Sequence, residues 1–110
     1  MAQTPEGKVK NAVKKLLKAR GAYFFMPMQN GMGVVGIPDI IACWEGRFLA
    51  IETKAPGKRG NTTANQDRQI GLIRKSGGFA LVVDDAEQVE DFLGRVANKL
   101  AYKNEGENDA

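Results

Sequence analysis

The sequence predicts a single α/β domain, a small sandwich of helices around a mixed β-sheet. Helical and strand-type segments follow one another in the order helix, three strands, helix, strand, helix. With 110 residues, the chain is long enough for one hydrophobic core and too short for two. We expect the folded domain to span residues 1–102, and residues 103–110 to form a polar, flexible tail.

Three segments have the apolar spacing of amphipathic helices. The first covers residues 5–20, after Thr4 as a cap and before a glycine that ends it. The second covers residues 64–76 and begins with capping-box spacing. The third covers residues 86–100, with an aspartate before it. One apolar stripe per helix predicts that each packs one face on the sheet.

Four segments read as strands, at residues 22–26, 40–44, 48–51 and 79–83. The second and third are rich in β-branched and aromatic side chains, and a short Gly-containing connection at 45–47 joins them. The sequence therefore predicts an antiparallel hairpin in the middle of the chain.

A Gly-rich loop at residues 27–36 separates the first strand from this hairpin. Gly31, Gly33 and Gly36 have the spacing of a dinucleotide-binding fingerprint, but strand-type residues rather than a helix follow them. We therefore reject that motif, and expect these glycines to let a mobile loop pass close to a ligand or to the sheet edge.

Composition excludes several kinds of chemistry and location. The chain has no histidine, which rules out a His-based general base, a zinc site with His ligands and a Ser-His-Asp triad. Its one cysteine, Cys43, lies in an apolar strand, where we expect a small buried hydrophobe. No apolar run approaches the roughly 20 residues of a membrane helix. Residues 1–6 lack the layout of a secretory signal. We expect a cytoplasmic protein, in the host cell if viral, with no membrane partner.

The charge is distributed unevenly along the chain. Residues 1–83 contain 13 Lys and Arg against 5 Asp and Glu, a net charge of +8. Residues 84–110 contain 3 against 8, a net charge of −5. A basic body with an acidic C-terminal part favours a polyanionic partner on one side. The alternative is a solvated, lysine-rich surface with no binding role.

The predicted hairpin brings three charged side chains together. Asp39, at the start of one strand, lies beside the far end of its partner, where Glu52 is found. Side chains alternate between faces, so Glu52 and Lys54 point the same way and Thr53 points the other. Two carboxylates and the backbone carbonyl of Thr53 are oxygen ligands of the kind that Mg²⁺ prefers. The ammonium of Lys54 can orient a water molecule or contact a phosphate. Together these groups meet the requirements of metal-assisted phosphodiester hydrolysis. The alternative is an exposed Glu–Lys pair with a turn Asp and no catalytic role.

The motif at residues 36–39 (Gly-Ile-Pro-Asp), followed at hairpin distance by residues 52–54 (Glu-Thr-Lys), resembles the PD-(D/E)XK nuclease superfamily. With Glu6 in the preceding helix and Gln66 at the start of the next, residues 4–100 resemble a stand-alone, phage-type VRR-NUC domain, the virus-type replication and repair nuclease. The resemblance implies a restriction-endonuclease-like α-β-β-β-α-β-α sandwich around a mixed central sheet.

The resemblance also implies roles for individual residues. Asp39 and Glu52 would bind Mg²⁺ or Mn²⁺, and Lys54 would act on water or phosphate. Glu6 would bind a second ion or its water shell; the alternative is a helix-dipole partner in solvent. Gln66 would support the site, cap the helix, or do both.

Membership of this family implies a metal-dependent endonuclease for branched DNA, with the four-way (Holliday) junction as the favoured substrate and a role in DNA repair. It also implies a homodimer whose two sites cut across the junction. We expect phosphate contacts from basic side chains on the first two helices and on the loop after residue 54: Lys8, Lys10, Lys14, Lys15, Lys18, Lys58, Arg59, Arg68, Arg74 and Lys75. Two alternatives stay open: a non-catalytic nucleic-acid-binding or dimerisation module, and a related nuclease with restriction-type or flap specificity.

Overall fold

The computed structural model describes residues 3–29 and 33–108, with side chains up to residue 97. The elements are α1 (Pro5–Ala19), β1 (Tyr23–Phe25), β2 (Ile40–Trp44), β3 (Arg47–Thr53), α2 (Ala64–Lys75), β4 (Phe79–Val83) and α3 (Ala86–Asn108). Helices and strands follow in the predicted order, and the predicted α/β sandwich is confirmed.

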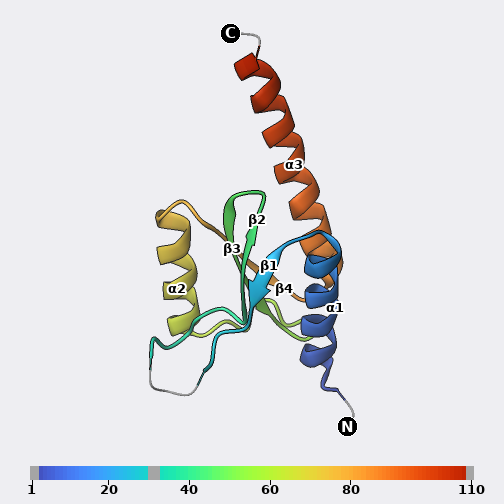
Figure 1. Cartoon of the computed structure of the whole chain (residues 1–110). Coiled ribbons are helices and arrows are strands. Elements are labelled where there is room, and N and C mark those ends of the chain that lie inside the picture. Colours follow the sequence, from blue (N-terminus) through green and yellow to red (C-terminus); the bar gives the residue numbers. More distant parts are fainter. Residues whose placement is uncertain (1–2, 30–32, 109–110) are drawn as a thin grey trace.

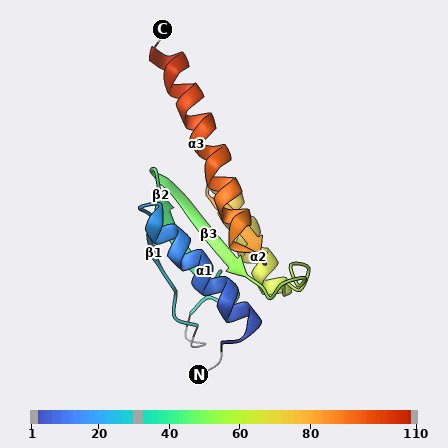
Figure 2. The same ribbon diagram turned by 90° about the vertical axis from the view of Figure 1, so that its right-hand side faces the viewer.

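The four strands form one mixed sheet in the order β1-β2-β3-β4. The first two pairings are antiparallel, and β3 pairs with β4 in parallel. Helices α1 and α3 lie together on one face of the sheet, and α2 lies on the other (Figure 1). Turned by 90°, the same molecule shows α1 and α3 side by side in front of the strands (Figure 2).

The β2–β3 hairpin closes through a two-residue turn. Glu45 and Gly46 both have positive φ, of 50° and 74°, and Trp44 pairs with Arg47 across the turn. Positive φ at both central positions is the geometry whose twist matches that of the flanking strands. β3 therefore begins at Arg47, one residue before the predicted strand.

The two faces of the sheet are covered unequally. The larger core lies under α1 and α3, where alternate β2 residues Ile40, Ala42 and Trp44 are buried. On the other face α2 packs over Ala50 and Ala80, on β3 and β4. Ile41 on β2 packs partly against this cluster, and the rest of the β1–β2 half of that face is left uncovered, because α2 is a single helix on a four-stranded sheet.

This unequal covering overturns the prediction for Cys43. The side chain is exposed, not buried. Cys43 alternates with Ala42 and Trp44 along β2, so it points to the half of the sheet that α2 does not cover. Its neighbours across the ladder, Tyr23 and Phe48, are exposed as well.

The helix ends follow the sequence signals, with one exception. Thr4 caps α1 by accepting the Gly7 amide at 2.9 Å, and the Trp44 indole donates to the carbonyl of Arg20 just beyond its last turn, at 3.1 Å. α3 differs, because its backbone stays helical to Asn108 instead of ending near residue 100.

Within residues 3–29 and 33–108, no helix is long and apolar enough to cross a membrane.

Candidate active site

The candidate residues lie at one end of the sheet, where β3 ends and β2 begins. Ile40 pairs with Ile51, so the next positions along each strand, Asp39 and Glu52, are neighbours as predicted. The N-terminal ends of α1 and α2 reach this end of the sheet from opposite faces (Figure 1). The site is therefore built by two strand ends and the first turns of two helices.

The carboxylate of Asp39 is fixed by Thr53 and Lys10. Its Oδ2 accepts the Thr53 backbone amide at 2.9 Å and the Thr53 hydroxyl at 2.8 Å. Its Oδ1 lies 3.6 Å from Nζ of Lys10 on α1. The two hydrogen bonds from Thr53 occupy Oδ2. Oδ1 is therefore the oxygen that faces a cation, in this case the ammonium of Lys10.

Glu52 is a carboxylate in a buried position, and one of its oxygens has no protein partner. The residue is only 3% exposed. Oε2 accepts from Nε2 of Gln66 at 3.1 Å and lies 3.5 Å from Nζ of Lys54. Oε1 is buried and receives no hydrogen bond from the described part of the chain. A buried acceptor without a protein donor is costly, so Oε1 is suited to bind a cation or a water molecule.

The pKa of Glu52 is raised from 4.5 to about 7, mainly by burial and next by the nearby charge of Asp39. Lys54 acts in the opposite direction through its charge and a hydrogen bond. The β2–β3 register, which places Asp39 and Glu52 as neighbours, accounts for the influence of Asp39. Two neighbouring carboxylates with little access to water repel each other, so binding of a proton or of a cation between them is favoured.

Gln66 performs both of the roles left open for it. Its Oε1 accepts the Thr63 amide at 2.9 Å, which completes a capping box at the start of α2. The same oxygen accepts from Nζ of Lys54 at 3.1 Å, while Nε2 donates to Glu52. A helix cap therefore holds the lysine and the glutamate in fixed positions.

Gly36 lets the loop before β2 pack against the first turn of α2. It has φ of 87°, and a Cβ here would lie 2.4 Å from the carbonyl carbon of Asn65 and 2.7 Å from the amide of Gln66. The same loop is tied by Gln29, whose amide donates to the Ile37 carbonyl at 2.8 Å. The close approach predicted for this glycine is thus to a helix terminus, and not to a ligand or to the sheet edge. Gly31 lies outside the described residues.

The donor set fits a hard divalent cation. Two carboxylates share one end of the sheet, and the unpartnered Oε1 of Glu52 is an oxygen acceptor of the kind Mg²⁺ and Mn²⁺ prefer. Among the described residues, no group of three or more His, Cys, Asp and Glu side chains is placed to hold a metal. Glu6 is thus not gathered with Asp39 and Glu52, and its effect on Glu52 is the weakest of those that shift its pKa.

The predicted phosphate contacts fall on different parts of the molecule. Those on α1 and α2 belong to helices that cover opposite faces of the sheet, and they extend from the first turns near Asp39 and Glu52 to the last turns. Exposed positions are Lys8, Lys15, Lys18, Lys58, Arg59 and Arg68, while Lys14 is partly buried. Arg74 is exposed, but its guanidinium donates twice to the Ala80 carbonyl, at 3.2 and 2.7 Å, and ties α2 to β4.

Two residues at the site were not assigned there from the sequence. Lys10 pairs with Asp39, and the signal for it was its place one helical turn after Glu6, on the same face of α1. Asp84, after β4, binds the loop that follows Lys54. No local pattern pointed to Asp84, because its partner lies 27 residues earlier in the chain.

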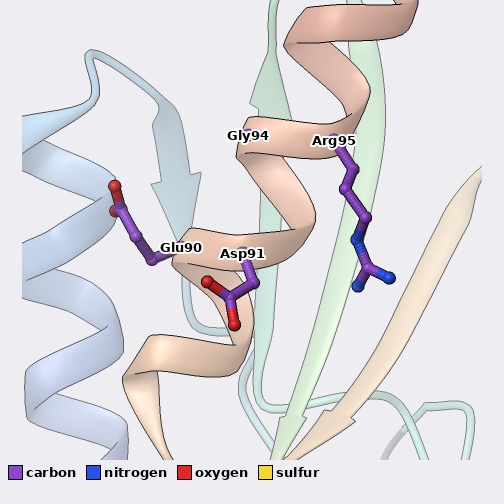
Figure 3. A pocket seen from close by; sticks show the side chains of 4 residues that line it. All are labelled: Glu90, Asp91, Gly94 and Arg95. Carbon is purple, nitrogen blue, oxygen red and sulfur yellow. The ribbon is translucent and has the colours of Figure 1, made fainter.

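A surface hollow of about 560 Å³ lies on α3, away from this site. It is lined by Glu90, Asp91, Gly94 and Arg95, and Glu90 points toward α1 (Figure 3). There it binds Arg20. None of the candidate site residues lines this hollow.

Comparisons with known proteins agree with this geometry. The mixed sheet with helices on both faces defines the class as a restriction-endonuclease-like α/β sandwich. A solved structure described as a VRR_NUC domain superimposes on this chain with a TM-score of 0.66 and 27% sequence identity, over 84% of this chain and 97% of that one. The fold is therefore that of a VRR_NUC domain, and the chain is a nuclease-like domain. No family model and no curated protein matches the sequence.

Proposed function

We propose that the protein is a divalent-metal-dependent, structure-selective DNA endonuclease, with residues 1–102 as the nuclease domain. The observation that carries this proposal is the buried, unpartnered Oε1 of Glu52 beside the carboxylate of Asp39. A purely structural role gives no reason to bury a carboxylate with one oxygen unsatisfied. A VRR_NUC domain as structural neighbour supports the same activity.

In this proposal Asp39, Glu52 and the Thr53 carbonyl hold Mg²⁺ or Mn²⁺, and Glu6 contributes to its water shell. The ion, when bound, supplies Lewis acidity toward the scissile phosphate and lowers the pKa of water. Thr53 orients Asp39 through two hydrogen bonds. Lys54, held by Gln66, places an ammonium beside Glu52, where it orients the attacking water or offsets the charge that develops on phosphate.

Lys10 gives the site a second ammonium. In the absence of a metal it balances Asp39 from 3.6 Å. We propose that Lys10 would contact a phosphate of the substrate when the charge of Asp39 is balanced by a metal ion instead. Lys8, Lys14, Lys15, Lys18, Lys58, Arg59 and Arg68 provide further contacts to the DNA backbone, and Arg74 contributes less because its guanidinium is engaged.

Branched DNA is the proposed substrate, with the four-way junction first. The basic residues belong to α1 and α2, which cover opposite faces of the sheet, and this is better matched to arms that diverge from the site than to one straight duplex. Such an enzyme acts in the cytoplasm, in DNA repair or in phage DNA processing.

The test of the proposed function is a panel of duplex, flap, splayed and four-way DNA, each incubated with Mg²⁺, Mn²⁺ or EDTA. We expect cleavage of the four-way junction only with a metal. Replacing Lys54 by Ala should lower the rate by about 10²-fold or more, as removal of one electrostatic contact in a catalytic site does. The matched control is Arg95→Ala, which removes an exposed cation on α3, away from the candidate site.

Each alternative has its own result on this panel. Sequence-dependent cutting of plain duplex would indicate a restriction-type nuclease, and preference for the flap a flap nuclease. Salt-sensitive DNA binding that no metal converts into strand scission would indicate a non-catalytic module and contradict the proposal.

We further propose a homodimer, formed through the uncovered β1–β2 half of the sheet and the adjoining start of β3. Tyr23 is 73% exposed on the edge strand, and Phe25 and Phe48 are 48% exposed beside it. A contiguous exposed apolar surface of this kind favours a protein partner, and a two-fold copy can pair the same surface with itself.

We expect sedimentation equilibrium to give a mass of about twice 12.0 kDa. Replacing Phe48 by Lys should give a monomer that stays folded, since the side chain is half exposed in the single chain. Glu87→Lys, on exposed α3 surface, is the control and should stay dimeric. A wild-type monomer at micromolar concentration would contradict this part of the proposal.

A further inference from the structure

The loop that follows Lys54 is held in place by Asp84, at the end of β4. Oδ2 of Asp84 accepts the Gly57 backbone amide at 2.8 Å. Oδ1 accepts from Nε2 of Gln88 at 2.7 Å, and Oε1 of Gln88 accepts the Asp84 amide in return, at 3.0 Å. Both carboxylate oxygens are therefore engaged. The β3–β4 ladder continues beside them through a bond from the Lys54 amide to the Val83 carbonyl, at 2.8 Å.

After Lys54 the chain folds into two consecutive tight turns, and the Gly57 amide that Asp84 accepts lies in the first of them. The Lys58 amide donates to the Ala55 carbonyl at 2.9 Å, and the Asn61 amide donates to the Lys58 carbonyl at 3.0 Å. Gly57 has φ of 82°, a left-handed conformation that favours glycine. Lys58 and Arg59 are exposed where the two turns meet. This double turn (residues 55–61) is thus a fixed structure that carries two cations a few residues beyond the end of β3.

The position of Asp84 is unusual for the charge it carries. The Gly57 amide lowers the pKa of its carboxyl, with Gln88 and then Arg59 acting in the same direction, so Asp84 is ionised at neutral pH. An anion next to a proposed phosphate-binding turn repels DNA by its charge alone. Only the geometry that it imposes on the turn can make it favourable for binding.

We propose that Asp84 is a positioning residue for DNA binding: through Gly57 it fixes the turn so that Lys58 and Arg59 hold a backbone phosphate flanking the scissile one. The ligand is a phosphodiester of the DNA substrate, so this inference depends on the proposed function. Asp84 itself touches no DNA in this arrangement.

The test is the affinity for a four-way junction, measured by fluorescence anisotropy in EDTA at several salt concentrations. Asp84→Asn keeps the size of the side chain but leaves one carbonyl oxygen for the two N–H donors of Gly57 and Gln88. We expect it to weaken binding by about 3- to 10-fold and to lower the slope of log K against log salt by about 1 to 2, because two cations lose their phosphate.

The direction of the change in DNA affinity distinguishes a positioning role of Asp84 from a simple effect of its negative charge. Asp91→Asn removes the same charge from an exposed position on α3 and should leave binding unchanged or slightly tighter. In Gly57→Ala the added Cβ would have no atom within 4 Å, so the variant disturbs the turn only by straining its left-handed backbone conformation. It should weaken binding as Asp84→Asn does. Urea unfolding of each variant checks that the fold is retained.

A double-mutant cycle gives the decisive outcome. In a Lys58→Ala, Arg59→Ala background, Asp84→Asn should have no further effect on affinity or salt slope, because it acts through those side chains. An Asp84→Asn protein that binds as tightly as wild type, or that weakens equally in that background, would overturn the inference while leaving the nuclease intact. A wild-type protein that binds no DNA would overturn the proposed function, and this inference with it.

Discussion

Glu52→Gln is expected to abolish cleavage and, at pH 8 without metal, to make the protein more stable. The lost activity follows from the loss of a metal-binding carboxylate, and we expect a fall of about 10³-fold or more. The gain in stability follows from burial, since the folded protein must hold an ionised Glu52 that is 3% exposed and has one unpartnered oxygen. Gln keeps an acceptor for Lys54 and Gln66 without the charge.

The pKa of Glu52 sets the pH window of this effect. It rises from 4.5 to about 7 on folding, so between these values the folded state binds more protons than the unfolded state. The free energy of unfolding therefore falls as the pH rises from 4.5 to 7, and the stability is fully present only below that window. This rise already includes the opposing charge of Lys54, and the buried amide of Gln offsets part of the gain, so at about 1.4 kcal/mol per pKa unit we expect Glu52→Gln to gain about 1–3 kcal/mol at pH 8.

Urea unfolding in EDTA at pH 4.5, 6, 7 and 8 measures this difference. The wild-type and Glu52→Gln curves should converge at pH 4.5 and separate as the pH rises. Glu87→Gln, an exposed acid on α3, is the control and should follow wild type throughout. A Glu52→Gln protein that is inactive and less stable at every pH would mean that this carboxylate is structural, and would remove the argument for a cation site.

The second large effect is expected for Gly36→Ala. A Cβ at this position would lie 2.4 Å and 2.5 Å from the carbonyl carbon and oxygen of Asn65, so backbone must move. The segment displaced is the first turn of α2, which places Gln66 against Glu52 and Lys54. We expect a loss of about 2–4 kcal/mol in the free energy of unfolding. The cleavage rate should fall by a larger factor than the decrease in the fraction of folded protein explains.

Gly46→Ala is the matched control. It too has positive φ, of 74°, but its Cβ would meet nothing within 4 Å. It therefore carries backbone strain alone, about 1 kcal/mol, and lies at the hairpin turn far from the sheet end that forms the site. Equal losses of stability for the two variants, with normal cleavage by Gly36→Ala, would show that the contact with α2 does not support the site.

Much of the fold could be predicted because its signals are local. β2 and β4 begin and end where their apolar runs do, and the capping box of α2 is formed by the residues that showed its spacing. The neighbouring placement of Asp39 and Glu52 follows from hairpin register, which a short turn fixes. α3 continues past residue 100 because no proline interrupts the polar segment that follows.

The remaining features depend on contacts between distant parts of the chain. Cys43 has the pattern of a buried strand residue, and its exposure depends on how far α2 reaches across the sheet. Gly36 has an ordinary loop context, and its importance comes from a helix about thirty residues later. Lys10 and Asp84 reach the site from α1 and from the end of β4, and no sequence period relates either residue to its partner.

Anomalous scattering from crystals grown with Mn²⁺ tests the central claim most directly. We expect one strong peak within about 2.3 Å of Oε1 of Glu52 and of a carboxylate oxygen of Asp39, absent from crystals of Glu52→Gln. Manganese bound elsewhere on the molecule, or bound equally well by that variant, would contradict the account.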